Sequence, residues 1–312
     1  MVSGRFAPSP TGRLHVGNLR TAALGWLAAR STGRGHLVRM EDLDRVNSSR
    51  DHEAAQLADL AALGIDWDGA VIRQSERFER YESAIDTLTD RGLTYECFCT
   101  RREVRAEIDD APRAPHLPAD AYPGTCRELS DAERNRRRDG GRPPALRLRA
   151  GSATEPGEVD TVSVDDVVCG PFTAAVDDIV LRRNDGVPAY HVAVVVDDAA
   201  QGVTQIVRAD DLLPSTPRQI HLQHLLGLRT PEYAHVPLVV GGDGERLAKR
   251  HGAVTLPDLA AAGWGTPELL AWVAASLGTA VEAPASVEEL LDDFDLCTIP
   301  TRPVVFEQAR ST

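Results

Sequence analysis

The chain has 312 residues, of which 42% are hydrophobic and 26% are charged, so it has room for one large globular domain or two to three smaller ones. It contains no run of about 18 or more apolar residues and no charged-then-apolar leader, which excludes a membrane span and predicts a soluble, cytoplasmic protein. Its net charge of -13 disfavours a general nucleic-acid binder, because phosphate contacts need Lys or Arg.

Residues 1–95 alternate between strand and helix patterns, which is typical of a parallel α/β sheet. The expected elements are strands at 5–7 and 36–40 and helices at 19–30 and 51–63. The proline-containing segment 8–12 is a loop, and Gly64 suits the C-terminal cap of the second helix. We interpret residues 1–95 as the first half of a nucleotide-binding catalytic domain of Rossmann type.

Residues 96–181 are rich in proline, arginine and cysteine, and we interpret them as an insertion. Seven arginines gather in it, at positions 134, 136, 137, 138, 142, 147 and 149. They form either a positive acceptor-binding surface on an acidic protein or an ordinary solvated helix face.

The catalytic pattern resumes over residues 182–243, and a helical segment follows. We expect strands at 179–181, 192–196 and 236–240 and a helix at 216–226. Apolar residues recur at helical spacing between 256 and 294, so residues 244–312 are predicted to form a basic loop and a small C-terminal helical domain.

The segment 8–18 opens the first helix and is the first candidate site. The N-terminus of a helix presents free backbone N–H groups and a partial positive charge, Gly17 permits close approach, and His15 can donate a hydrogen bond to a phosphate. ATP is a suitable ligand for this segment, because it carries phosphate groups. The alternative is an ordinary strand-to-helix turn, which is common in α/β proteins.

The second candidate is the segment 245–251, which follows the glycine-rich turn 241–244. All but one of the 34 Lys and Arg residues are arginines, and the exception, Lys249, lies in this segment. A compact ammonium on a mobile loop can neutralise charge on a leaving pyrophosphate. A solvated basic loop is the alternative.

Together the two segments resemble the HIGH and KMSKS signatures of class I aminoacyl-tRNA synthetases, and the pair is far more specific than either alone. The sequence departs from them at Asn18, which replaces the final histidine of HIGH, and at Arg246 and Ala248, which replace the first lysine and the serine of KMSKS. The resemblance implies contacts to ATP from His15, Gly17, Asn18 and Lys249, with His15 and Lys249 catalytic.

Within that class, segment 5–12, the pair 41–42 and the stretch 190–211 resemble the glutamyl branch. Glutamate needs arginines for its two carboxylates and an acid for its ammonium. The resemblance implies that Arg5 and Arg208 bind carboxylates, Glu41 binds the ammonium, and Ser9 and Tyr190 form hydrogen bonds. The implied glutamate site is Arg5, Phe6, Ala7, Pro8, Ser9, Glu41, Tyr190 and Arg208. Each of these also has a bland alternative, such as a surface ion pair for Arg208.

Three of the five cysteines are close in sequence, at Cys97, Cys99 and Cys126. Three thiols near a turn suit a tetrahedral Zn²⁺ site, and chemistry alone leaves the fourth ligand open between Tyr122 and His116. The resemblance selects Tyr122, because glutamyl-Q tRNA(Asp) synthetases carry a similar Cys-x-Cys and Tyr-x₃-Cys structural zinc site. Three buried cysteines without metal are the alternative.

Two features resemble that subfamily and not the protein-synthesis enzymes. The chain ends at Thr312, where protein-synthesis enzymes continue into an anticodon-reading region, and Val194 stands where they usually place an asparagine. The resemblance implies an enzyme, expected as a monomer, that activates L-glutamate with ATP and Mg²⁺ and attaches it to queuosine in tRNA(Asp).

Three alternatives remain open at this point. The first is a truncated glutamyl-tRNA synthetase that charges tRNA(Glu). The second is a non-catalytic, zinc-containing RNA-binding protein with the same fold. The third is another adenylate-forming or nucleotidyl-transferring α/β enzyme, which would not explain the set Arg5, Glu41 and Arg208.

Overall fold

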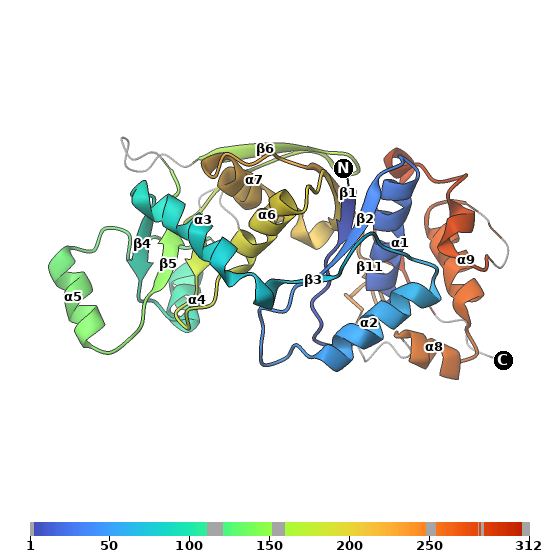
Figure 1. The fold of residues 1–312 in the computed structure, drawn as a ribbon, viewed down its shortest axis with the longest axis horizontal. Coiled ribbons are helices and arrows are strands. Elements are labelled where there is room, and N and C mark those ends of the chain that lie inside the picture. The colour runs from blue at the N-terminus through green and yellow to red at the C-terminus, as the bar shows by residue number, and fades with distance from the viewer. Residues whose placement is uncertain are drawn as a thin grey trace.

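The computed structural model describes residues 3–110, 121–151, 160–247, 254–279, 281 and 284–307. The molecule is elongated, with helix α5 (Asp131–Asp139) at one end and helix α9 (Thr266–Ser276) near the other (Figure 1). Within those residues, no helix combines the length and the apolar character that crossing a bilayer requires.

A parallel sheet is built from both halves of the chain. Its first part is β1 (Ser3–Phe6), β2 (Gly35–Met40) and β3 (Ile72–Arg73), and its second is β9 (Gln205–Ala209) and β10 (Glu232–Val236). A parallel bridge between Ser3 and Val203 joins the two parts. The predicted α/β fold with a parallel sheet is therefore confirmed.

Helix α1 (Val16–Arg30) connects β1 to β2 and is buried on nearly every side. It begins at His15 in a reciprocal capping box: the His15 side chain accepts from the backbone N–H of Asn18, and the Asn18 side chain accepts from that of His15. These bonds satisfy two backbone donors that a helix start leaves free. Helices α2 (Arg50–Ala62) and α3 (Phe78–Asp90) follow; the 3-10 turn η1 (Gln74–Glu76) leads into α3.

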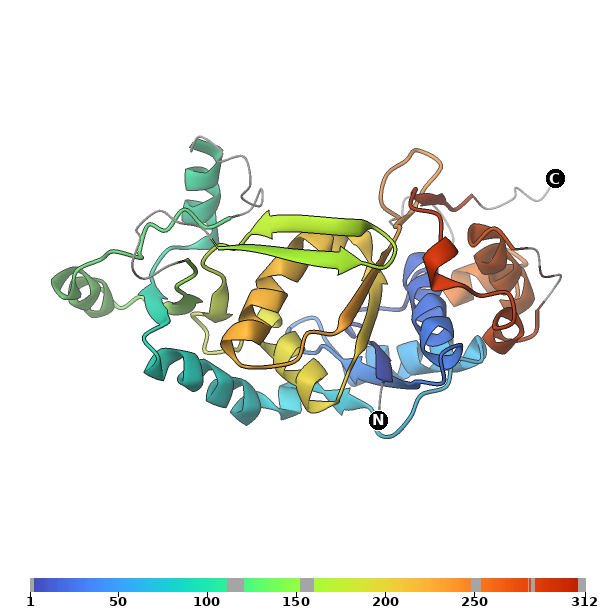
Figure 2. The ribbon, with the colours of Figure 1, turned by 90° about the horizontal axis from the view of Figure 1, so that it is seen from above.

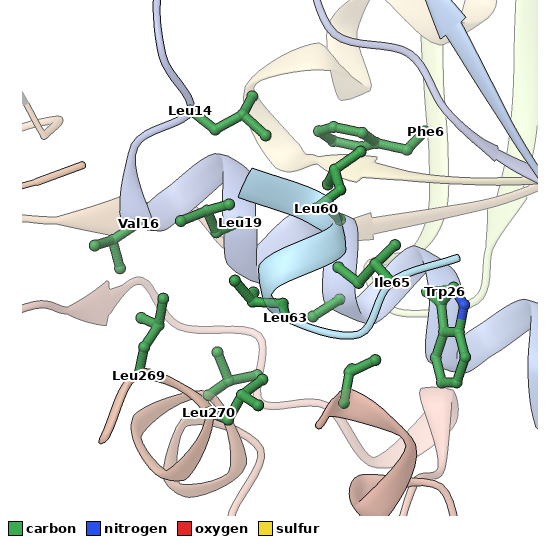
Figure 3. Close-up of a cluster of buried hydrophobic side chains, with 14 of the residues drawn as sticks. Phe6, Leu14, Val16, Leu19, Trp26, Leu60, Leu63, Ile65, Leu269 and Leu270 are labelled. Atoms are coloured by element: carbon green, nitrogen blue, oxygen red, sulfur yellow. The ribbon is translucent and has the colours of Figure 1, made fainter. Parts of the chain in front are cut away.

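The main hydrophobic core surrounds α1. Figure 3 shows Leu19 of α1 between Leu60 and Leu63 on one side and Leu269 and Leu270 on the other. Burying one such side chain stabilises the fold by about 1.5–3 kcal/mol. This core fixes the start of α1 against the rest of the catalytic half.

The segment predicted to be an insertion, residues 96–181, contains most of a small antiparallel sheet and a long hairpin. Its elements are β4 (Thr94–Cys97), α4 (Arg101–Asp110), α5, β5 (Ala145–Leu148), β6 (Thr161–Asp166), β7 (Gly170–Ala175) and, at its end, β8 (Val180–Arg182). The sheet order is β4-β5-β8, and β6 pairs with β7. Figure 2 shows the β6-β7 hairpin lying over helix α7 (Thr216–Leu225), which brings the end of β6 close to β10.

Two expectations in the second catalytic half are corrected. The predicted strand 192–196 is wrong, because these residues lie inside helix α6 (Tyr190–Ala200). An apolar run fits a buried strand or a buried helix equally well, and Val192 and Val195 pack against α3 in the helical form. The predicted strand 236–240 is interrupted: β10 ends at Val236, Pro237 follows, and β11 (Val239–Val240) is separate. The 3-10 helix η2 (Asp210–Ser215) joins β9 to α7.

The C-terminal segment contains short helices within the range 256–294, where helical spacing was predicted, and continues beyond it. It contains α8 (Leu256–Ala261), α9, the 3-10 turns η4 (Val287–Leu290) and η5 (Leu296–Thr298), and then β12 (Val304–Val305), which pairs with β11. Its apolar side chains belong to the same buried cluster as α1. A separate C-terminal domain therefore stays a prediction.

Candidate active site

A cavity of about 520 Å³ lies at the carboxyl ends of β1, β2 and β9, the edge at which open α/β sheets bind ligands. Its wall includes all the predicted glutamate-binding residues and two of the predicted ATP contacts: Arg5, Phe6, Ala7, Pro8, Ser9, Glu41, Tyr190, Arg208, His15 and Asn18. Gly17 lies next to His15 but does not line the wall. Lys249 lies outside the described residues.

Arg208 is a buried cation that has no carboxylate partner among the described residues. Its side chain is 4% exposed, and its nitrogens donate to His235 Nε2 at 2.9 Å, Gln219 Oε1 at 2.8 Å and Thr216 Oγ1 at 2.8 Å. All three partners are uncharged when His235 is neutral, and a buried charge without a counter-ion is costly. Arg208 therefore suits an anionic ligand in the cavity.

Arg5, by contrast, belongs to a charge-balanced cluster. Its Nε lies 3.3 Å from Asp198 Oδ1, and Arg39 Nη1 donates to the same oxygen at 2.6 Å. Burial alone would raise the pKa of Asp198, but Arg39 and Arg5 hold it below its usual range. Asp198 thus orients Arg5, and the Nη1 group of Arg5 has no hydrogen-bond partner within the described chain.

Glu41 is an acidic residue on the cavity wall. Burial raises its pKa, and the charges of Arg39 and Arg5 oppose that rise. One carboxylate oxygen accepts from Arg39 Nη2 at 3.2 Å, and the other has no hydrogen-bond partner in the described part of the chain. Glu41 can therefore accept a further hydrogen bond from a cationic ligand group.

The loop after β1 is held by hydrogen bonds to its backbone. Gln56 of α2 donates to the carbonyl oxygens of Ser9 and Gly12 at 3.0 and 2.7 Å, and the backbone N–H of Glu41 donates to Pro8 O at 2.9 Å. Pro8 and Pro10 have no N–H group, so bonds to the carbonyl oxygens do most to hold this loop. The anchoring leaves the side chain of Ser9 exposed on the cavity wall.

His15 is neutral at physiological pH. Burial lowers its pKa first, and the nearby charge of Arg246 lowers it further. Its Nδ1 accepts from the backbone N–H of Asn18 at 3.2 Å, which leaves Nε2–H as a donor. Asn18 closes the capping box, so the replacement of the last histidine of HIGH keeps this geometry.

Only part of the predicted basic loop is described, and it contributes Arg246. This arginine lines the cavity, and its Nη1 lies 3.0 Å from Asp211 Oδ2. Because Arg246 is two-thirds exposed, this ion pair adds little stability.

A second cavity of about 900 Å³ lies between the insertion and α6 and shares Ser9, Glu41 and Tyr190 with the first. Six arginines line it: Arg101, Arg105, Arg142, Arg147, Arg183 and Arg218. A ligand here can reach the substrate cavity while contacting a positively charged wall. Of the predicted arginine cluster, Arg142 and Arg147 lie on this wall, and Arg142 also pairs with Glu103. Arg136 and Arg138 pair with Glu133 and Glu96.

Cys97, Cys99 and Cys126 converge in the insertion, with their Sγ atoms within 4.8 Å of one another. The Tyr122 hydroxyl lies 3.3 Å from Cys97 Sγ and 3.4 Å from Cys99 Sγ. Hydrogen bonds from Cys126 and Cys99 lower the pKa of Cys97, which favours a thiolate. Three sulfur atoms and one phenol oxygen thus meet where a metal ion could bind, whereas His116 lies outside the described residues.

Several residues that organise the site were not foreseen. Arg39, Asp198 and His235 contact Glu41, Arg5 and Arg208 respectively, each a predicted substrate residue. The adjacent Asp197 and Asp198 at the end of an apolar run were a usable signal, because buried acids need cationic partners. Val194 lies one helical turn after Tyr190, is 1% exposed and lines neither cavity.

Comparisons with known proteins agree with this geometry. The sequence matches the tRNA synthetases class I (E and Q), catalytic domain, over residues 1–298. It is 57% identical over 301 residues to the glutamyl-Q tRNA(Asp) synthetase of Nocardia farcinica, covering 96% of this chain and 92% of that protein. It is 39% identical to the glutamate–tRNA ligase of Aquifex aeolicus, covering 99% of this chain and 65% of that protein.

A solved structure is also similar along almost the whole chain. The glutamate tRNA ligase of Elizabethkingia meningosepticum, in complex with its amino acid, superposes with a TM-score of 0.81 at 26% identity, covering 98% of this chain and 67% of that one. Relatives named glutamyl-Q tRNA(Asp) synthetase also occur in Cutibacterium acnes, at 48% identity over 301 residues and 82% of that protein's length. The chain belongs to the class I tRNA synthetases of the E and Q group and, within it, to the glutamyl-Q tRNA(Asp) synthetase family.

Proposed function

We propose that this enzyme activates L-glutamate with ATP and transfers it to queuosine in tRNA(Asp), as the name of its relatives indicates. One observation supports the amino-acid specificity: the cavity wall holds the buried cation Arg208, which has no carboxylate partner among the described residues, together with Glu41, one oxygen of which accepts no hydrogen bond from them. A dicarboxylic amino acid satisfies both, because it brings a carboxylate to Arg208 and an ammonium to Glu41. The second carboxylate would contact Arg5, with Ser9 and Tyr190 as hydrogen-bond partners.

The ATP site would lie at the start of α1. His15 Nε2–H, Asn18 and the helix N-terminus offer donors to phosphate, and Gly17 leaves room beside them. An α-carboxylate oxygen of glutamate bonds to the α-phosphorus, and the bond to pyrophosphate breaks. Mg²⁺ would accompany the ATP, and Lys249 stays a sequence prediction for the charge on the leaving pyrophosphate.

Transfer would use the second cavity. A hydroxyl oxygen of the acceptor attacks the acyl carbon of the adenylate, AMP leaves and the hydroxyl proton is released. Arg101 and Arg105, exposed on the wall of this cavity, support an RNA acceptor here, because arginines on a surface offer contacts to phosphate. Positioning and charge stabilisation then suffice, and no side chain need form a covalent bond.

We further propose structural Zn²⁺ bound by Cys97, Cys99, Tyr122 and Cys126, supported by the convergence of their side chains. The proposed layout keeps the predicted units: catalytic halves 1–95 and 182–243, the insertion 96–181, and the loop with a helical domain 244–312. Only three large hydrophobic side chains are exposed among the described residues, Val46, Tyr190 and Val305, which supports a monomer. A tRNA acceptor supports action in the cytoplasm.

Two assays test the proposal. Glutamate-dependent exchange of labelled pyrophosphate into ATP, measured without tRNA, should be robust and should fail with aspartate or glutamine. Labelled glutamate should then appear on queuosine-containing tRNA(Asp) and not on tRNA(Glu). Charging of tRNA(Glu) would favour a truncated glutamyl-tRNA synthetase instead, and absence of any adenylate would favour a non-catalytic RNA-binding protein.

A further inference from the structure

His235 lies directly beside Arg208 because of the register of two parallel strands. Strand β10 pairs with β9 so that His235 is opposite Arg208, and the two side chains meet at 2.9 Å between Arg208 Nε and His235 Nε2. The histidine is 0% exposed and its ring stacks on Tyr233 at 6.0 Å between centroids. Neither residue can turn away without disturbing this face of the sheet.

The direction of the hydrogen bond fixes the protonation of the ring. The guanidinium can only donate, so Nε2 of His235 must carry a lone pair. The single ring proton is then on Nδ1, which donates to Asp166 Oδ2 at 2.5 Å. Burial lowers the pKa of His235, and the charge of Arg208 lowers it further against the effect of Asp166, so the ring stays neutral.

The two carboxylate oxygens of Asp166 accept hydrogen bonds from different groups. Oδ1 accepts from the backbone N–H groups of Val168 and Cys169 at 3.1 and 2.9 Å and thereby shapes the hairpin turn after β6. Oδ2 accepts from His235 Nδ1. Because the backbone N–H of His235 also donates to both oxygens, the carboxylate is fixed relative to β10.

We propose that Asp166 and His235 are positioning residues for the amino-acid substrate: Asp166 holds His235 in its Nδ1–H tautomer, and that tautomer orients the guanidinium of Arg208. This inference rests on the proposed function, in which Arg208 receives a glutamate carboxylate. The guanidinium of Arg208 has five N–H groups. The Nε–H donates to His235, one N–H of Nη1 donates to Gln219, and one N–H of Nη2 donates to Thr216. Two N–H groups therefore remain for the ligand. A fixed fork binds a carboxylate better than a mobile one.

A variant that favours the opposite tautomer of His235, with the ring proton on Nε2, tests the proposal. Asp166→Asn keeps an oxygen for the hairpin turn but places an amide N–H opposite Nδ1, so the ring proton moves to Nε2 and opposes the N–H of Arg208. His235→Gln keeps an acceptor near the position of Nε2 that does not depend on a tautomer. The double variant Asp166→Asn/His235→Gln therefore separates the tautomer effect from any structural effect of Asp166.

The expected result is a KM for glutamate that rises about tenfold or more in Asp166→Asn, with the KM for ATP within about twofold of wild type, in pyrophosphate exchange. In the His235→Gln background, Asp166→Asn should change the glutamate KM less than about twofold. An unchanged glutamate KM in the single variant, or an equal penalty in both backgrounds, overturns the inference. A purely structural Asp166 would produce that equal penalty.

The tautomer can also be observed without any reaction. In protein labelled with ¹⁵N-histidine, the His235 signals should show a protonated Nδ1 and an unprotonated Nε2. A protonated Nε2 overturns the inference. A protonated Nδ1 in a protein that lacks glutamate-dependent exchange overturns the proposed function while supporting the orientation of Arg208 by His235.

Discussion

At the scale of single residues, the buried arginines differ in how their charge is compensated. Arg39 and Arg5 share Asp198, and Arg39 also contacts Glu41, so their charges are neutralised inside the protein. Among the described residues, Arg20 and Arg208 both bond only to uncharged groups, and of these two only Arg208 lines the cavity. Burying an unpaired charge costs several kcal/mol, so the position of Arg208 on the cavity wall suits an anionic ligand.

We predict that Arg208→Gln raises the glutamate KM about ten- to a hundredfold in pyrophosphate exchange, because it removes a hydrogen-bonded charge contact of about 1.5–3 kcal/mol. Arg34→Gln is the matched control: Arg34 is partly exposed, pairs with Glu232 and lies outside the cavity wall. It should leave the KM unchanged. Equal effects of the two substitutions would remove Arg208 from the glutamate site.

His36 of β2 is buried, and both of its ring nitrogens lack a hydrogen-bond partner within the described chain. Burial lowers its pKa from 6.5 to about 4, with a smaller contribution from Arg30. The His36 ring is therefore protonated near pH 6.5 in the unfolded chain but only near pH 4 in the folded chain. Above pH 6.5 the protonation of this residue does not lower the free energy of unfolding, and that free energy falls as the pH drops from 6.5 towards 4.

Replacing His36 with leucine should remove that loss. Denaturant unfolding should show that the difference in stability between His36→Leu and wild type grows by about 3 kcal/mol in favour of the variant from pH 7 to pH 4. The comparison cancels other titrating groups, since both proteins carry them. A difference that stays constant over this pH range would show that His36 takes up its proton equally easily in both states.

At the scale of elements, the start of α1 depends on a glycine that sits against the capping histidine. A Cβ on Gly17 would lie 3.0 Å from His15 Cε1 and 3.1 Å from Nδ1, which is tighter than most real Cβ contacts, so His15 would have to shift by a few tenths of an ångström. Gly25, in the same helix, has its nearest such neighbour at 3.8 Å. The two glycines therefore form a matched pair for substitution.

Gly17→Ala should displace His15 and raise the KM for ATP by about tenfold, whereas Gly25→Ala should leave it unchanged and stabilise the helix by about 0.5–1 kcal/mol. ATP titrations in the exchange assay and thermal unfolding measure the two effects. If both variants kept the wild-type KM for ATP, the proposed contact between His15 and phosphate would be wrong.

The same elements show what sequence reasoning could reach. Helices 19–30 and 51–63 and the strands before them were predictable because their periodicity and Gly64 are local signals. The strand predicted at 192–196 failed because an apolar valine run carries no periodicity, and packing against α3 selected the helix. His235 was unreachable for a different reason: its role arises from strand register and from the distant Asp166.

At the scale of the whole molecule, the hydrophobic core consists of separate buried clusters, and their boundaries do not coincide with the regions proposed for glutamate activation and for transfer. One cluster joins α1 to the C-terminal helices, and a second joins α3, α6 and the end of the insertion. The cysteine region has a small cluster of its own with Tyr95, Phe98 and Tyr122. The substrate cavity takes its wall from outside that small cluster, so the two can respond separately to a perturbation.

We therefore predict that losing the proposed zinc separates activation from transfer. Cys126→Ser should abolish zinc content and lower transfer of glutamate to tRNA(Asp) at least about tenfold, while glutamate-dependent pyrophosphate exchange changes less than about twofold. Cys297→Ser is the control, because Cys297 is exposed and lies outside the cysteine cluster.

Zinc content measured by mass spectrometry, exchange and transfer should be followed on the same preparations, because metal loss with intact exchange shows that the catalytic half keeps its fold. Exchange that falls in parallel with transfer would show instead that the insertion supports the glutamate cavity itself. Cys97 and Cys99 lie on the wall of the second cavity, and Cys126 completes their cluster. Transfer that persists without zinc would therefore show that this cavity keeps its shape without the metal.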